Sequence, residues 1–243
     1  MSTLAANPSD QALYNMVSGA TPGTIADVIA IMKSIDALLP ESDGLKWFNR
    51  EYLMVTEDVN AKPPGGVWQS PAWLDRLDVV FAGFYFQALA DSLAGRDVPS
   101  SWSALFRARF NTGIDRIQFA LAGMNAHINH DLALALLKTN ADLNIVPARD
   151  GPEHRDFESV NELLNSLMPE VLTMLATDAL GYLAQDTGKI GRILAYWNVC
   201  RARDLAWDFA DHLRKLSGIA HGPALEIQDA FTGALGRAIL MQL

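Results

Sequence analysis

The chain has 243 residues, of which 50% are hydrophobic and 19% are charged, and its formal net charge at pH 7 is −9. A chain of this length and apolar content can bury a sizeable core, while its acidity and scattered Lys and Arg residues argue against nucleic acid, whose phosphate backbone requires clustered basic side chains. The single cysteine, Cys200, excludes an intramolecular disulfide and cannot form a thiolate metal site alone.

The first 23 residues are rich in Ser, Ala, Asn, Gly and Pro. They have neither the basic region nor the apolar region of a secretory signal peptide. No apolar run in the chain reaches the roughly 18–20 residues that span a bilayer. We therefore expect residues 1–23 to be a loosely ordered arm with at most a short turn at 11–17, and the protein to be cytoplasmic and without a membrane span.

Helical patterns begin after this arm. Thr24 can cap a helix through its side-chain oxygen, and Pro40 ends that helix because proline cannot continue the hydrogen-bond ladder. Trp47 and Tyr52 belong to an amphipathic pattern that predicts a second helix over residues 45–59.

A third helix is expected after the KPPGG stretch at 62–66, which breaks the chain. Ser70 as N-cap and Pro71 at the first helical position are typical start signals, and the apolar pattern continues to Gly95. A short fourth helix is expected over residues 99–110.

The stretch 114–139 is the one around which we expect the fold to be arranged. It is apolar on most faces, which is typical of a buried core helix. Its centre carries five polar residues: Asn125, His127, Asn129, His130 and Asp131. Burying a polar group without a partner costs on the order of 1–3 kcal/mol, so the fold must either pair these groups or use them.

The rest of the chain predicts one long loop and three more helices. The loop, residues 142–156, is polar and is a candidate lid or pocket edge. The helices are expected at 157–185, with a kink at Pro169, at 190–216 and at 223–241. No segment alternates for long enough to predict a strand. We therefore predict an all-α fold in which residues 24–243 form a single compact domain of roughly eight helices around a buried central helix at about 114–139.

The polar residues of the central helix suggest a site. Residues three and four apart share a helix face, so His127 lies beside His130 and Asp131, and Asn125 and Asn129 form a neighbouring row. These groups can ligate a metal, or act without one, with His127 as general base and Asp131 orienting it. A third alternative is structural, with the polar groups bonded to other helices. We favour metal-free acid–base chemistry with His127, Asp131 and His130 as catalytic residues.

The helix geometry argues against a metal. A catalytic zinc site usually needs three protein ligands, but His130 and Asp131 are adjacent and diverge by about 100° around the helix. A third ligand would have to come from Asp78 or from a stripe that is typical of a solvated helix face, namely Asp204, Asp208 and His212. We therefore predict no metal and no cofactor.

Candidate substrate-binding residues lie on and around the central helix. Asp78 interrupts the apolar third helix, and together with Tyr85 it can point at the polar centre. Tryptophans that line a pocket would suit an apolar ligand. The candidates are Asn125, Asn129, Asp78, Tyr85 and Trp207.

Three runs of the sequence carry a resemblance: GMNAHINHDLALAL at 123–136, LDVVFAGFYFQAL at 77–89 and WFNREYLMVTEDV at 47–59. Together they resemble a bacterial family known only as a domain of unknown function, whose marker is an Asn-Ala-His-Ile-Asn-x-Asp-Leu run. The resemblance covers most of residues 40–215. It implies a shared site and brings no activity with it.

The central helix is also faintly similar to the helical zinc-dependent phospholipase C and nuclease fold. In that fold, a His followed four residues later by an Asp on a core helix binds zinc, as His127 and Asp131 would here. That fold also uses an N-terminal Trp and further His ligands, whereas this chain begins MSTLAAN and has five His in all.

Three hypotheses about function remain open. The first is an enzyme, of cyclase, isomerase or hydrolase type, that acts on a small, largely apolar molecule in a pocket between core helices and uses the His/Asn/Asp residues for acid–base chemistry. The alternatives are a metal-dependent hydrolase and a non-catalytic helical ligand-binding or scaffold protein. The sequence leaves the oligomeric state open.

Overall fold

The computed structural model describes residues 8–61, 67–175 and 198–241. Over these ranges the fold is all-α, as predicted, and contains no strand. The helices are α1 (Pro8–Val17), α2 (Ile25–Leu38), α3 (Leu45–Ala61), α4 (Pro71–Leu93), α5 (Ser100–Ala108), α6 (Arg116–Ala126), the π-helix η2 (His127–Asp131), α7 (Leu132–Asp142), α8 (Pro152–Leu175), α11 (Val199–Lys215) and α12 (Gly218–Ile239). The predicted break at 62–66 and the predicted helical residues 176–185 and 190–197 lie outside the described residues.

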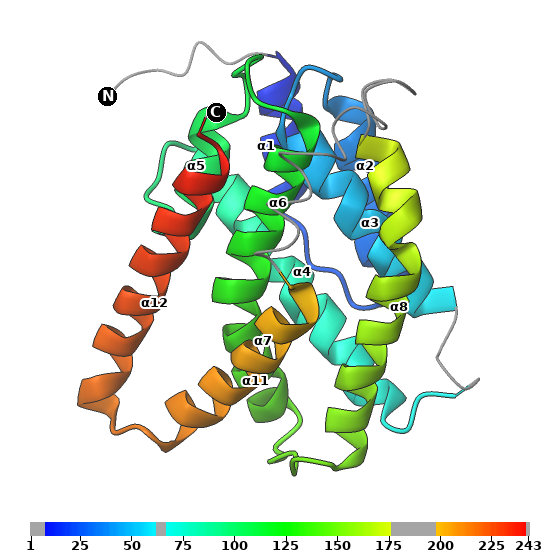
Figure 1. Ribbon diagram of the computed structural model, residues 1–243, viewed down its shortest axis with the longest axis vertical. Helices are drawn as coiled ribbons and strands as arrows, with labels where there is room; N and C mark the ends of the chain where they lie inside the picture. Colours follow the sequence, from blue (N-terminus) through cyan, green and yellow to red (C-terminus); the bar gives the residue numbers. More distant parts are fainter. Residues whose placement is uncertain (1–7, 62–66, 176–197, 242–243) are drawn as a thin grey trace.

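The central helix is built from α6, η2 and α7, which follow one another without a gap. Asp115 and Gln118 form a capping box at its start. Every residue of α6 after Arg116 is buried. Figure 1 shows this green rod in the middle of the molecule, with α5 and α12 on one side and α2, α3 and α8 on the other. The predicted buried central helix is therefore confirmed.

Helix α3 lies very close to α6 because Gly123 has no side chain. A Cβ atom added at this position would overlap the ring of Phe48. The close approach brings the buried face of α3 against the central helix, where Tyr52 packs beside Phe48. The placement of Tyr52 matters for the site described below.

Helix α4 packs on α7 and also contacts η2, as expected from its apolar sequence. Ser70 precedes its first residue, but the Ser70 side chain does not cap the helix. Instead the carboxylate of Asp156 accepts hydrogen bonds from the backbone N–H groups of Gln69 and Ser70, at 2.9 and 2.6 Å. The side-chain cap predicted at Ser70 is thus absent, and α8 instead holds the two residues that precede α4.

Two helix boundaries differ from the prediction. Helix α8 begins at Pro152, because proline suits the first helical position, so the loop that precedes it is shorter than the predicted 142–156. Helix α12 begins at Gly218 and contains Pro223, which we expected to start it. The predicted cap at Thr24 is present, since its side chain accepts from the Asp27 N–H at 3.2 Å.

Within the N-terminal stretch expected to be a loose arm, Pro8–Val17 form helix α1. Leu13 and Val17, which share one face, are buried against α2 and α4. Asp10 accepts a hydrogen bond from the buried guanidinium of Arg109, at 2.9 Å. These contacts fix α1 although its composition resembles that of a loop.

Candidate functional site

The five residues His127–Asp131 form a π-helical turn inside the central helix. The N–H of Leu132 donates to the carbonyl of His127, five residues earlier, instead of to the residue four earlier. Turns of this kind are rare and are frequently found at functional sites. The polar residues identified in the sequence therefore coincide with the one irregularity of this rod.

Asp131 is the acceptor of a three-donor network, which we call the Asp131 network. Its carboxylate accepts from Trp102 Nε1 at 2.9 Å, from His127 Nδ1 at 3.0 Å and from His130 Nδ1 at 2.8 Å. Burial works to raise the pKa of Asp131, but the two histidines outweigh it and hold that pKa below its usual range. Because a carboxylate only accepts, both histidines carry a proton on Nδ1.

From the sequence we expected the adjacent side chains of His130 and Asp131 to point in different directions, and this is right only in part. The adjacent side chains do meet, but the two histidines use different oxygens of the same carboxylate, so all three groups still do not converge on one point. Among the described residues, no group of three or more His, Cys, Asp or Glu side chains is placed to hold a metal ion.

His127 lies in a box of aromatic rings and is 1% exposed. Phe81 stacks on its imidazole with ring centroids 3.5 Å apart, and Tyr52 meets it edge-on at 4.6 Å. Burial lowers the pKa of His127, and Asp131 opposes this only in part. The ring is therefore neutral near pH 7, with its proton on Nδ1. Its other nitrogen, Nε2, is buried and has no hydrogen-bond partner.

Two further unpaired polar atoms belong to Tyr52, whose ring meets His127, and to Asp78, whose charge acts on Tyr52. They are Tyr52 Oη and Asp78 Oδ2, both shielded from solvent. Asp78 precedes Phe81 by three residues and so shares the face of α4 that meets His127. We call Tyr52, Asp78 and His127 the core polar cluster.

The pKa values indicate how the core polar cluster is protonated. Burial raises the pKa of Asp78 to about 7, although the charge of Arg203 opposes the shift. Burial also raises the pKa of Tyr52, and the charges of Asp78 and Asp131 add to this effect. The Tyr52 hydroxyl therefore keeps its proton and lies within electrostatic reach of both carboxylates. The cluster offers a proton acceptor, His127 Nε2, beside the ring of Tyr52, whose hydroxyl holds a proton and interacts electrostatically with the Asp78 carboxyl group.

His130 points away from the core polar cluster. Its Nε2 lies 3.8 Å from Asp229 on α12, and Asp229 also accepts from the backbone N–H groups of Ser100 and Ser101 at the start of α5. Burial works to lower the pKa of His130, but Asp131 and Asp229 raise it above its usual value. His130 therefore joins the central helix to α12 and α5.

Asn125 and Asn129 also face α12. Asn125 Nδ2 donates to the carbonyl of Thr232 at 2.9 Å, and Asn129 Nδ2 donates to Asn125 Oδ1 at 3.0 Å. Gln228 donates to the backbone carbonyl of Asn129 at 2.7 Å. These amides, which we expected to bind substrate, are used to dock α12.

Tyr85 lies at the edge of the aromatic box, 6.4 Å from the His127 ring. Its hydroxyl donates to Asn49 Oδ1 at 3.3 Å, and the amide of Asn49 donates to the carbonyl of Met32. The Tyr85 hydroxyl is thus part of the contact between α4, α3 and α2.

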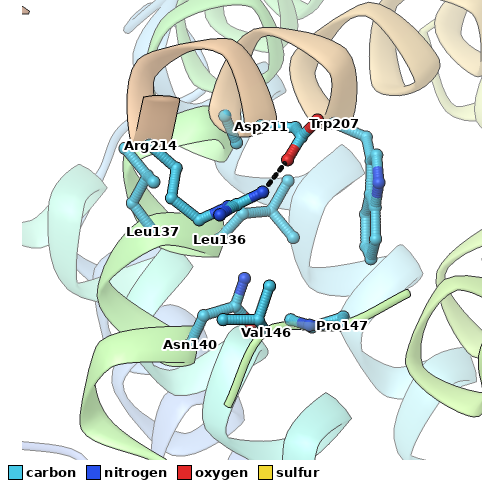
Figure 2. A pocket seen from close by; sticks show the side chains of 9 residues that line it. Leu136, Leu137, Asn140, Val146, Pro147, Trp207, Asp211 and Arg214 are labelled. Atoms are coloured by element: carbon cyan, nitrogen blue, oxygen red, sulfur yellow. Dashed lines mark hydrogen bonds and ion pairs between the residues drawn. The ribbon is translucent and has the colours of Figure 1, made fainter. Parts of the chain in front are cut away.

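Trp207 lies on α11 and packs against Trp73, His154 and Phe157. It also lines a pocket with Leu136, Asn140, Val146 and Pro147, the last two from the loop before α8; Figure 2 shows Arg214 and Asp211 across it. The volume of about 30 Å³ holds about one water molecule, too little for a substrate.

The acidic stripe of α11 has the character of a solvated face at two of its three positions. Asp208 is exposed and pairs with Arg149, and His212 is exposed. Asp204 is half-buried, and its Oδ1 has no hydrogen-bond partner. No helix in the described ranges is long and apolar enough to cross a membrane.

Two residues of the site were missed by sequence reasoning, Tyr52 and Trp102. Both are aromatic residues in amphipathic or short helices, where an apolar role is the ordinary expectation. The available signal was the spacing of Phe48 and Tyr52, which places both rings on the face of α3 that meets the central helix.

Comparison with known families gives one match. Residues 25–242 match the model of a family described as "Family of unknown function (DUF5995)". Neither a curated protein nor a solved structure shows a significant match to the chain.

Proposed function

The chain belongs to the DUF5995 family of unknown function, and from its own site we propose that it is an enzyme that performs acid–base chemistry on a small, largely apolar molecule at the core polar cluster. The observation that carries this proposal is the state of His127. Its Nδ1 is held by a buried carboxylate while its Nε2 has no partner. A neutral imidazole oriented in this way is the usual arrangement of a histidine general base.

The roles follow from protonation. His127 Nε2 takes a proton from the substrate, and Asp131 positions the ring and stabilises the imidazolium that results. Asp78, whose pKa is raised to about 7, and the Tyr52 hydroxyl are the groups able to return a proton or donate a hydrogen bond. We infer proton transfer at a carbon atom, as in an isomerase, as the reaction class.

The walls of the site define the substrate class. Phe48, Phe81 and Trp102 surround His127 together with Tyr52, so a substrate at Nε2 is in contact mainly with aromatic rings. Such walls favour an apolar molecule with one polar group. Because His127 is 1% exposed, a substrate reaches Nε2 only when neighbouring side chains move.

Solvent exchange tests the proposal without knowledge of the natural substrate. The protein is incubated in D₂O with cyclohexanone, and deuterium incorporation next to the carbonyl is followed by NMR. We expect exchange faster than in buffer alone for the natural chain, a loss of at least ten-fold in His127→Gln, and a smaller loss in Tyr52→Phe.

His130→Gln is the matched control, because His130 bonds to the same carboxylate but faces α12. It should keep the exchange activity while its melting temperature falls. Equal rates in the natural chain and in His127→Gln, with both folded by circular dichroism, would contradict the proposal.

A non-catalytic helical ligand-binding or scaffold protein is the second candidate, and the Asp131 network favours it. Trp102, His127 and His130 all donate to one carboxylate and connect α5 to the central helix. In this case Asp131→Asn would lower stability and there would be no exchange activity to lose.

A further inference from the structure

A second buried carboxyl group without a partner lies on α3 next to Tyr52, but it faces a different part of the molecule. Glu51 is 7% exposed, and its Oε2 atom is shielded from solvent and makes no hydrogen bond. It lines a pocket of about 260 Å³ between α3, α6, α8 and the start of α11. Neither His127 nor any other residue of the core polar cluster lines this pocket.

The walls of the pocket are apolar. They are formed by Ile117, Leu121, Met168, Val171, Leu172, Leu175 and Val199. Two other described residues in the lining are polar, Asn165 and Asn198, and both are exposed, so they stand at the mouth while Glu51 lies at the buried end. A small, mostly apolar pocket with one polar group at its end is the usual form of a site for a small molecule.

We propose that this pocket is a binding site for a small apolar molecule that carries one acceptor oxygen, such as a ketone, and that the Glu51 carboxyl group donates a hydrogen bond to that oxygen. The proposal goes beyond the acid–base site, because it concerns separate residues and requires no reaction. A ligand oxygen would give the unpaired carboxyl group its missing partner, and the apolar walls would enclose the rest of the molecule.

The charge around Glu51 favours an acceptor over a cation. Among the described residues that line the pocket, no other is titratable. Burial alone raises the pKa of Glu51 to about 8, so at pH 7 the group is mostly protonated and has an O–H to donate. An amine would first have to ionise Glu51 in this apolar setting, whereas a ketone accepts from the group as it stands.

The test uses camphor, a bicyclic ketone, and bornylamine, the amine with the same carbon skeleton. Protein labelled with ¹³C at the methionine methyl groups is titrated at pH 7, and the Met168 signal, assigned with Met168→Leu, reports binding in the pocket. We expect camphor to shift this signal to saturation, and bornylamine to bind at least five-fold more weakly.

Variants of Glu51 separate recognition from folding. Glu51→Leu should bind camphor at least five-fold more weakly while its melting temperature rises, because it removes an unpaired buried group. Glu51→Gln keeps a donor and should bind within about three-fold of the natural chain. Asp78→Asn, which changes an unpaired carboxyl group outside this pocket, is the control and should leave camphor binding unchanged.

Three outcomes would overturn the proposal. The first is an unshifted Met168 signal at the solubility limit of camphor. The second is tighter binding of bornylamine than of camphor, which would indicate a site for apolar cations. The third is unchanged camphor affinity in Glu51→Leu.

Discussion

Two regions of the core bury ionisable side chains, and they differ in how those side chains are paired. At one end of the molecule, Arg109 bonds to both oxygens of Asp43 and to Asp10, and Asp43 also accepts from the N–H of Leu45. In the core polar cluster, Tyr52, Asp78 and His127 each have a buried polar atom without a partner. Both regions are shielded from solvent, but only in the first do the buried polar atoms have hydrogen-bond partners.

The difference separates groups that hold the fold from groups that cost it stability. Removing one partner of a buried ion pair strongly destabilises the fold, because the other charge is then left buried without its counterpart. A buried group that is already alone weakens the folded state in the natural chain, and such costs are typical of functional sites. The comparison therefore predicts that mutations in the first region lower the unfolding free energy, whereas mutations that remove an unpaired buried group leave it unchanged or raise it.

The largest effect is expected at the paired region. Arg109→Leu leaves the fully buried carboxylate of Asp43 without its cation, and we expect the unfolding free energy to fall by about 3–5 kcal/mol in urea titrations. The double variant with Asp43→Leu should recover a large part of this loss. A cost below about 1 kcal/mol for Arg109→Leu would remove the distinction between the two regions.

An intermediate effect of opposite sign is expected at Glu51, which lies outside both regions but, like the core polar cluster, has a buried polar atom without a partner. Its pKa is about 8 in the folded chain against an ordinary value of 4.5, so the folded state holds this proton more tightly than the unfolded state. The stability that this provides is present below about pH 4.5 and is lost as the pH rises through about 8.

Glu51→Gln removes this titration. At ~1.4 kcal/mol for each pKa unit, the variant should gain on the order of 3 kcal/mol relative to the natural chain between pH 5 and pH 8.5. Unfolding free energies of both proteins across this range measure the gain. A difference that does not change with pH would show that Glu51 ionises normally in the folded chain.

The smallest effect is expected for two tyrosines that share the aromatic box. Tyr85→Phe removes a hydroxyl that donates to Asn49 and should cost about 1 kcal/mol. Tyr52→Phe removes a hydroxyl without a hydrogen-bond partner and should leave the unfolding free energy unchanged or raise it by less than about 1 kcal/mol. Thermal denaturation of the two variants side by side gives the difference, and equal losses would contradict the assignment of Tyr52 to the unpaired group.

The fold was predictable from local patterns, because helix caps and apolar spacing act over a few residues. Thr24 and its capping box, and the buried stretch around 114–139, are examples. The spacing of four also predicted that His127 lies beside Asp131, and their side chains are 3.0 Å apart.

The partners of the polar side chains were not predictable, because they come from helices distant in the sequence. Asn125 is paired by α12, more than 100 residues later, and Trp102 reaches Asp131 from α5. A periodic pattern shows that Tyr52 or Glu51 belongs to a helix, but it does not show whether a buried oxygen finds a donor. The sequence therefore identified the polar centre but not the partners of Asn125, Asn129 and Asp131 within it.

The π-helical turn at His127–Asp131 also determines how α7 is rotated about the helix axis relative to α6. One extra residue in the turn rotates everything that follows by about 100° relative to a continuous α-helix. This rotation lets α6 present its apolar residues to α3 and α12 while α7 presents its own to α4 and α11. The segment therefore tolerates exchange of side chains far better than a change of length, since deletion of one residue here would turn the whole of α7 away from its neighbours.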